Sequence, residues 1–323
     1  MNLLFGRCVN EGSSMDNEAL IGVVTVSFNS ASVIRGFMDS LLQQKHAAFI
    51  LYVIDNASSD ETLQRLAEYT DPRVVKIRNS TNVGVAEGNN IGIRAALKDN
   101  CAYVLLVNND TVFDDNLLSQ LKTGLQTYAC DMIVPKIVYF DVPDKIWCAG
   151  GYFRRLDGTS RHFGYGKKDD GRFDQSRSVP YSPTCCMLIK AAVFERIGLM
   201  DANYFVYFDD ADFCHRAQRQ AFRLYYLSSA RVRHKVSSLT GGAESDFTVR
   251  YCTRNQVYYV LKNLPRWQLL YYLPLFQIRI FAKYFLLSRR LTALWMAEKA
   301  FFAGVSLFNS RSVMHQPSTS GQD

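Results

Sequence analysis

The sequence predicts an α/β fold with a mostly parallel central sheet flanked by helices and followed by a C-terminal helical appendage. Short apolar runs typical of buried strands alternate with segments of helical periodicity, an order that produces βαβ units. Several of these runs end in acids or amides, and an open α/β sheet binds its ligands just beyond the carboxyl ends of its strands. Together these observations also place a candidate site at one edge of the sheet.

The elements follow in order along the chain. We expect strands at 20–27, 49–54, 74–77 and 103–107, with helices at 31–44, 62–69 and 84–97. Further on, we expect a helix at 117–128, a strand at 132–134, an apolar run at 185–189, a helix at 191–197 and a strand at 224–227. Residues 139–180 are rich in Gly and charge, which favours loops and short strands.

Composition excludes several classes of protein. With 323 residues, 48% of them hydrophobic, the chain is long enough for a large folded domain and is not of disordered type. Its eight Cys form no CxxC pair and no zinc spacing, so we expect reduced thiols and a cytoplasmic protein. Residues 1–18 have no pattern of a secretory signal and are expected to be a loose lead-in.

The net charge of +7 is unevenly distributed. No Asp or Glu occurs between Phe247 and Ala297, a stretch that holds eight Arg or Lys, which leaves 29 basic and 30 acidic residues elsewhere. The basic character therefore belongs to the C-terminal part.

The strand-to-helix turns suggest a nucleotide site without a glycine-rich phosphate loop. The turn after the first strand, from Ser27 through Asn29, contains no Gly, so it matches neither a dinucleotide-binding nor a Walker motif. The strand ending at Val107 is followed by Asn108, Asn109 and Asp110. A carboxylate beside two amides can hold a hard divalent cation. The alternative is a polar turn that only closes the strand.

A second acidic group opens a later helix. Asp209, Asp210 and Asp212 follow an aromatic run. Acids at a helix N-terminus can be ordinary capping, but three exceed what capping needs, and paired carboxylates can create a general base. His234 ends the segment 230–234, where a lone His would usually be structural.

These segments together resemble the family 2 glycosyltransferases of the GT-A nucleotide-diphospho-sugar transferase fold, in their rhamnosyltransferase-like branch. The resemblance covers roughly residues 20–265. It rests on Val26-Ser-Phe-Asn29, Val53-Ile-Asp55-Asn56-Ala-Ser58-Ser59-Asp60, Asn82-Val-Gly84-Val-Ala86-Glu-Gly88-Asn89-Asn90, Leu106-Val-Asn108-Asn109-Asp110-Thr111, Phe208-Asp209-Asp210-Ala211-Asp212 and His234.

The resemblance implies roles for these residues. Nucleotide-sugar binding would involve Ser27, Asn29, Asp55, Asn82, Gly84, Asn108 and Asn109. In that set, Asp55 would accept a hydrogen bond from a pyrimidine imide, with Asn82 in the same pocket. Asp110 and His234 would hold a divalent cation, Mg²⁺ or Mn²⁺. Asp210 would be the general base, with Asp209 and Asp212 in possible support.

Two positions depart from the family pattern. Asn108 replaces the first acid of the Asp-x-Asp motif, which leaves less negative charge on the metal. Thr184 occupies a position where the family often has Gly, which affects the floor of the donor pocket.

The activity implied is an inverting transfer of a sugar, first L-rhamnose from dTDP-L-rhamnose, to a hydroxyl of a bacterial cell-surface glycan or lipid-linked acceptor. The alternatives are a same-fold enzyme using a UDP-hexose or UDP-galactofuranose, and a non-catalytic nucleotide-sugar-binding member. A nucleic-acid binder is a third class. The basic part lacks a nucleic-acid motif, so we expect no nucleic-acid partner.

We expect a GT-A catalytic domain over 19–246, with a nucleotide-binding half at 19–110 and an acceptor half at 111–246. A basic amphipathic helical region would follow at 247–309, and a disordered tail at 310–323. In the segment 269–287, Arg279 and Lys283 would each cost about 2.5–3.5 kcal/mol mid-membrane, which disfavours spanning. We expect helices lying on an anionic membrane at the cytoplasmic face, with packing on the catalytic domain as the alternative.

Overall fold

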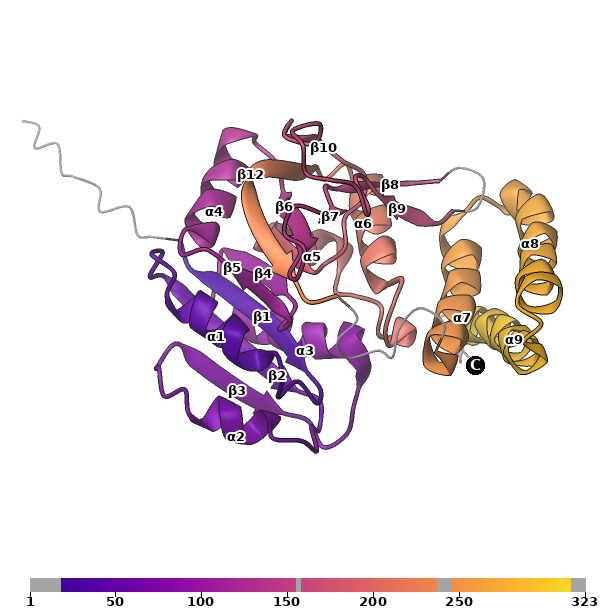
Figure 1. Ribbon diagram of the computed structural model, residues 1–323, viewed down its shortest axis with the longest axis horizontal. Coiled ribbons are helices and arrows are strands. Elements are labelled where there is room, and N and C mark those ends of the chain that lie inside the picture. Colours follow the sequence, from indigo (N-terminus) through magenta and orange to yellow (C-terminus); the bar gives the residue numbers. More distant parts are fainter. Residues whose placement is uncertain (1–18, 155–157, 237–244, 315–323) are drawn as a thin grey trace, which may run out of the picture.

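A computed structural model describes residues 19–154, 158–236 and 245–314. The expected lead-in lies outside the described residues, as does the tail beyond Met314. A ten-stranded sheet runs through the molecule with helices on both faces, and α7 (Asp246–Asn263), α8 (Arg266–Phe281) and α9 (Leu291–Met314) gather at one end (Figure 1). This confirms the predicted α/β class, the mostly parallel sheet and the helical C-terminal part.

The N-terminal half forms the parallel part of the sheet. Its strands lie in the order β4-β1-β2-β3 and are all parallel. They are β1 (Ile21–Ser27), β2 (Phe49–Asp55), β3 (Val74–Arg78) and β4 (Tyr103–Val107), and the connecting helices are α1 (Ile34–Leu42), α2 (Thr62–Ala67) and α3 (Gly84–Lys98). Strands β1, β2 and β4 are buried on both faces, as near-continuous apolar runs require, whereas the edge strand β3 is partly exposed.

The second half extends the sheet with mixed pairing. Strand β11 (Cys186–Lys190) lies antiparallel between β4 and β6 (Met132–Tyr139), and β12 (Leu224–His234) runs parallel to β6. Around them lie β5 (Thr111–Phe113), α4 (Leu117–Thr127), β7 (Ile146–Cys148), β8 (Gly151–Phe153), β9 (Ser160–His162), β10 (Arg177–Ser178), α5 (Ala191–Ile197), η1 (Ala202–Tyr204) and α6 (Asp209–Arg219).

Strand β12 is longer than the sequence predicts. The expected strand at 224–227 and the segment 230–234 form one strand, whose register against β6 shifts between Leu227 and Arg231. Such an irregularity interrupts the alternation of inward and outward side chains from which a strand is predicted, so the sequence predicts two separate segments.

Two apolar clusters cover the two faces of the sheet. One includes α1 and α4 residues such as Phe37 and Leu121. The other includes α3 and α6 and continues into the C-terminal helices, with Tyr258 of α7 and Ala297 of α9 among its members. The residues expected to form the appendage thus share a core with the catalytic part, while the domain boundaries given above stay a prediction.

Helix α9 packs closely on α7. A Cβ at Gly304 would lie 2.5 Å from the carbonyl oxygen of Arg254, so only Gly permits this approach of the two backbones. The helix ends at Met314, inside the segment 310–323 that we expected to be disordered.

The C-terminal helices also expose many apolar side chains. Leu270 and Leu287 are 81% and 83% exposed, respectively. We define the exposed apolar set of α8, the π-helical turn η2 (Ala282–Leu287) and α9 as Trp267, Leu270, Leu275, Ile278, Phe281, Phe285, Leu286, Leu287, Leu291 and Phe302. Among described residues, one helix, at 291–310, is long and apolar enough to cross a membrane by length and composition, although its inner face packs on α7.

Candidate active site

The carboxyl ends of β1 and β2 place two predicted residues side by side at one edge of the sheet. Ser27 lies opposite Asp55 in the parallel register. Asp55 is buried; its Oδ2 accepts a hydrogen bond from Ser58 N at 3.2 Å, and its Oδ1 has no partner among the described residues. A buried carboxylate oxygen with spare capacity is suited to accept a hydrogen bond from a ligand.

Asn109 ties the end of β4 to the end of β1. Its Nδ2 donates to Val26 O at 3.0 Å, Ser27 Oγ at 2.8 Å and Ser30 Oγ at 2.9 Å. Asn108 has an exposed side chain, while its backbone N–H donates to Cys185 O. The amide of Asn109 is therefore occupied in shaping the turn, whereas that of Asn108 faces solvent.

Asn29 and Asn82 shape two neighbouring turns. Asn29 adopts a left-handed φ of 49°, and its Oδ1 accepts from Ser59 N at 2.9 Å. Asn82 Oδ1 accepts from Gly84 N at 2.9 Å. Gly84 has a φ of 83°, and a Cβ there would lie 2.5 Å from the carbonyl oxygen of Phe205. Gly84 is thus required for the close approach of the 205–208 loop.

Asp110 and His234 lie close together in the fold although 124 positions separate them in the sequence. Strand β5 pairs antiparallel with β12 and puts Thr111 opposite His234. As a result, His234 Nε2 lies 3.1 Å from Asp110 Oδ1, with both side chains buried. The ring of Trp147 packs edge-on against His234 at 4.6 Å between centroids.

The Asp110–His234 pair fits a divalent cation in donor chemistry and spacing. One carboxylate oxygen and one imidazole nitrogen are ordinary ligands for such ions. Two adjacent ligands of an octahedral ion, each about 2.1 Å from it, lie about 3 Å apart, close to the observed separation. Among the described residues, no group of three or more His, Cys, Asp or Glu gathers around one point. Asp110 and His234 are thus the two described residues whose geometry fits such an ion at this position.

Asp210 begins α6 beside a tyrosine. The Tyr181 hydroxyl donates to its Oδ2 at 2.9 Å, and Ala211 N donates to its Oδ1 at 2.7 Å. Burial raises the pKa of Asp210, while these hydrogen bonds oppose the rise. Burial and the adjacent Asp210 carboxylate raise the pKa of Asp209 to about 8. Of these two carboxylates, Asp210 is the one that accepts a side-chain hydrogen bond, which opposes the rise of its pKa.

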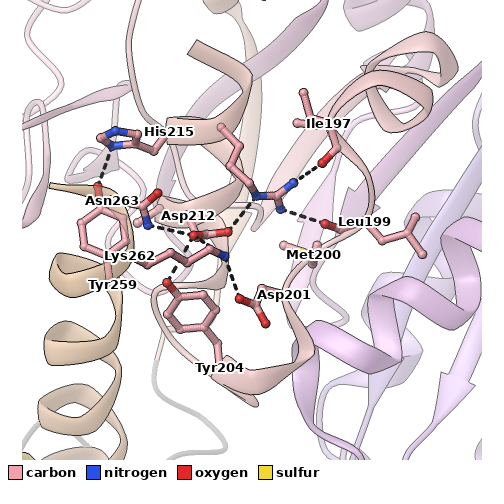
Figure 2. A network of polar contacts seen from close by, with 12 residues as sticks. Ile197, Leu199, Met200, Asp201, Tyr204, Asp212, His215, Tyr259, Lys262 and Asn263 are labelled. Atoms are coloured by element: carbon pink, nitrogen blue, oxygen red, sulfur yellow. Dashed lines mark hydrogen bonds and ion pairs between the residues drawn. The ribbon is translucent and has the colours of Figure 1, made fainter. Parts of the chain in front are cut away.

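Asp212 lies in a different environment (Figure 2). Its carboxylate pairs with Arg216 Nε and Lys262 Nζ, each at 2.8 Å, and accepts from Asn263 Nδ2 at 2.8 Å. Burial would raise the pKa of Asp212, but the two cations hold it below its usual value. Lys262 also pairs with Asp201 at 2.7 Å. Asp212 therefore joins α6 to α7 and is not available as a base.

The loop before Asp209 is strained and pinned from α7. Phe205, Tyr207 and Phe208 all have positive φ, and Val206 N donates to Tyr204 O at 2.7 Å across Phe205. Such conformations are costly for non-Gly residues and persist only when neighbours enforce them. Asn255 Nδ2, fully buried, donates to the carbonyls of Tyr204, Val206 and Tyr207.

Sequence reasoning missed Asn255 and Tyr181 as site residues. Asn255 gives one signal in the sequence, because it is a polar residue and a poor helix former inside a run of helical periodicity. Tyr181 gives no such signal, because its contact with Asp210 exists only after β11 and α6 are assembled.

Comparison with known proteins identifies the family. The sequence model described as Glycosyl transferase family 2 matches residues 22–198. The low-salt glycan biosynthesis hexosyltransferase Agl10 of Haloferax volcanii is 28% identical over 240 residues, which cover 73% of this chain and 74% of Agl10. A second relative is the Escherichia coli UDP-Glc:alpha-D-GlcNAc-diphosphoundecaprenol beta-1,3-glucosyltransferase WfgD, 26% identical over 102 residues, 32% of this chain and 39% of WfgD.

A solved structure shows the same fold. The mannosyltransferase PcManGT from Pyrobaculum calidifontis, in complex with GDP-Man and Mn²⁺, superposes with a TM-score of 0.53 at 15% identity, over 93% of this chain and 81% of that one. At this identity the likeness supports the architecture, and the chemistry rests on the residues above.

Proposed function

The chain belongs to glycosyl transferase family 2, and on that premise we propose that it is an inverting transferase of a hexose from a pyrimidine-nucleotide donor to a lipid-linked or cell-surface glycan. The observation that carries the proposal is the Asp110–His234 pair at 3.1 Å, which ring contacts through Trp147, His162 and Tyr181 connect to Asp210. That the chain is a glycosyltransferase follows from the family and from its hexosyltransferase relatives.

For the donor, we propose dTDP-L-rhamnose first. L-Rhamnose is a deoxyhexose, so it agrees with the hexosyltransferase relatives without being required by them. The free Oδ1 of buried Asp55 supports a pyrimidine base, because it can accept the imide N–H of thymine or uracil. The second candidate is a UDP-hexose, favoured by the UDP-Glc in the name of WfgD.

Asp110 and His234 would hold Mg²⁺ or Mn²⁺. When bound, the cation supplies positive charge to the diphosphate leaving group. Support comes from the donor set and from Mn²⁺ in the PcManGT complex.

Asp210 would take the proton of the acceptor hydroxyl. Tyr181 and the backbone N–H of Ala211 orient its carboxylate. A positioned carboxylate base deprotonates the attacking hydroxyl directly, and no protein nucleophile is then needed. Direct displacement inverts the anomeric configuration.

We also propose a peripheral location on the cytoplasmic face of the membrane. The exposed apolar set and the basic residues of 247–309 support it, since apolar area and basic charge both favour anionic lipid surfaces. Flotation with anionic liposomes tests this with the full chain. Replacing Leu270 and Leu287 by Ser should reduce flotation, and unchanged flotation would contradict the membrane role.

The transfer itself is tested by screening nucleotide sugars for nucleoside-diphosphate release, with Mn²⁺, with Mg²⁺ and with chelator. Saturation-transfer NMR with dTDP-L-rhamnose and a UDP-hexose then compares the two donors. Preference for the UDP-hexose would replace the first candidate by the second. Failure to release nucleoside diphosphate from any donor with acceptor present would favour a non-catalytic member.

A further inference from the structure

A groove of about 800 Å³ lies between α7 and α9, outside the residues assigned above to donor, cation and base. Three cations line it, namely Arg250, Arg254 and Lys299. The groove also contains Phe247, Tyr251 and Trp295, and Trp295 is 62% exposed. Cations beside exposed aromatic rings form an amphipathic surface, and a purely polar ligand would leave its apolar part uncovered.

The charge of the groove is positive. Its acid is Asp246, whose Oδ1 lies 3.7 Å from Arg290, so its charge is partly met from outside the groove. Lys299 Nζ lies 3.5 Å from the centre of the Trp295 ring, and Arg250 and Lys299 are both exposed. Arg250 lies over the Tyr251 ring at 5.8 Å from its centre, so each of the two solvent-facing cations lies beside an aromatic ring of the groove. Such cations suit a phosphate or diphosphate group.

The groove shares a wall with the strained loop that precedes the base. Phe205 stacks on Tyr251 at 5.1 Å between ring centroids, and Tyr207 contacts Phe247 at 6.5 Å. Arg254 NH2 donates to Asn203 O and Tyr204 O at 2.8 and 2.7 Å. A ligand in the groove would therefore lie against the loop that leads within a few residues to Asp210.

We infer that this groove binds the phosphate-bearing headgroup of an amphiphilic acceptor, with the lipid chain leaving toward the exposed apolar set. The inference rests on the proposed function and specifies its acceptor class as a lipid phosphate or diphosphate. In this arrangement the phosphate contacts Arg250 and Lys299, and Trp295 borders the start of the apolar chain. The 205–208 loop forms the wall of the groove that leads to Asp210. A free inorganic anion would use the cations but none of the apolar wall.

The test measures binding without turnover. Equilibrium dialysis of the full chain uses farnesyl diphosphate below its critical micelle concentration, with chelator present and no nucleotide sugar. The chelator removes any cation that could attract the probe to Asp110 and His234. Inorganic diphosphate and farnesol are the comparison ligands, and they separate a free-anion site and a purely apolar site from an amphiphile site.

Two matched variants locate the site. The groove variant carries Arg250→Gln and Lys299→Gln, and the control carries Lys283→Gln and Arg289→Gln, which removes the same charge from exposed positions of the same region. Arg254 is left unchanged because it holds backbone carbonyls of the loop. Equal thermal unfolding midpoints of both variants and wild type verify folding.

The expected result is an increase of about tenfold or more in the Kd for farnesyl diphosphate in the groove variant, and less than about twofold in the control. Equal weakening in both variants would mean general attraction to a basic surface and would overturn the inference. So would inorganic diphosphate or farnesol binding as tightly as farnesyl diphosphate, or no binding by wild type. Because no sugar is transferred, these outcomes are independent of the donor, cation and base assignments.

Discussion

Asp110 and the acidic run that begins α6 differ in how their negative charge is compensated. Asp110 is buried beside the imidazole of His234 at 3.1 Å. In the run that begins α6, Asp212 is compensated by two cations, whereas Asp209 has a raised pKa beside Asp210. Three acids within four positions thus divide into a structural ion pair, a carboxyl with raised pKa and a candidate base, so proximity in sequence does not imply a shared role.

A row of aromatic rings connects the two centres. Tyr181, which binds Asp210, stacks on His162 at 5.9 Å between centroids; His162 contacts Trp147 at 4.7 Å; and Trp147 contacts His234. Burial lowers the pKa of His162 to about 4, so this ring is neutral near pH 7. The row of rings between the Asp110–His234 pair and Asp210 therefore contains a neutral His162.

The largest effect is expected at Asp210. Asp210→Asn retains the volume but cannot accept a proton, so transfer should fall by about 10²–10⁴-fold while donor binding and folding persist. Steady-state kinetics with isothermal titration of the donor measure both. Near-wild-type turnover would move the role of base to Asp209 and remove the contrast drawn above.

Lys262 tests the structural side of the contrast. Lys262→Met leaves Asp201 and Asp212 with less compensation, and removing one partner of a buried ion network costs about 3–5 kcal/mol. Denaturant unfolding should show this loss, with exposed Lys98→Met as control. Adding Asp212→Asn should recover part of it, because the uncompensated charge is then gone; strict additivity would contradict the proposed coupling.

Substitutions in the Asp110–His234 pair should have a smaller effect on rate. Asp110→Asn or His234→Gln should weaken metal-dependent donor binding and lower activity by about 10–100-fold, since one ligand remains in each variant. Titration of Mn²⁺ against activity in wild type and both variants measures the shift. Full wild-type activity after exhaustive chelation would return 108–110 to the role of a polar turn.

The fourth prediction concerns the pH dependence of stability. The pKa of Asp209 is raised from its ordinary value near 4 to about 8, so the folded state binds this proton more tightly than the unfolded chain. Its contribution to stability is complete below about pH 4 and is lost as pH rises toward and through 8. Asp209→Asn should therefore flatten the decline of Tm over that range. An unchanged pH dependence would show that Asp209 ionises freely.

The sequence by itself determined the α/β class, most of the elements and the positions of Asp55, Asp110 and Asp210 at strand or helix ends. These features depend on local periodicity and on short runs of residue types, which survive without knowledge of long-range contacts. Most of their boundaries agree to within a few residues, for example 117–128 predicted against Leu117–Thr127 observed. The exceptions are β6 and β12, which extend further than the predicted 132–134 and 224–227.

Only the tertiary structure decided how these residues are partnered. The β5–β12 pairing brings His234 to Asp110, α7 supplies Lys262 to Asp212 and Asn255 to the 205–208 loop, and β11 with α6 places Tyr181 on Asp210. The physical reason is that burial and charge compensation arise between segments far apart in sequence. A carboxylate therefore becomes a base, a ligand or a structural ion only when its neighbours are assembled.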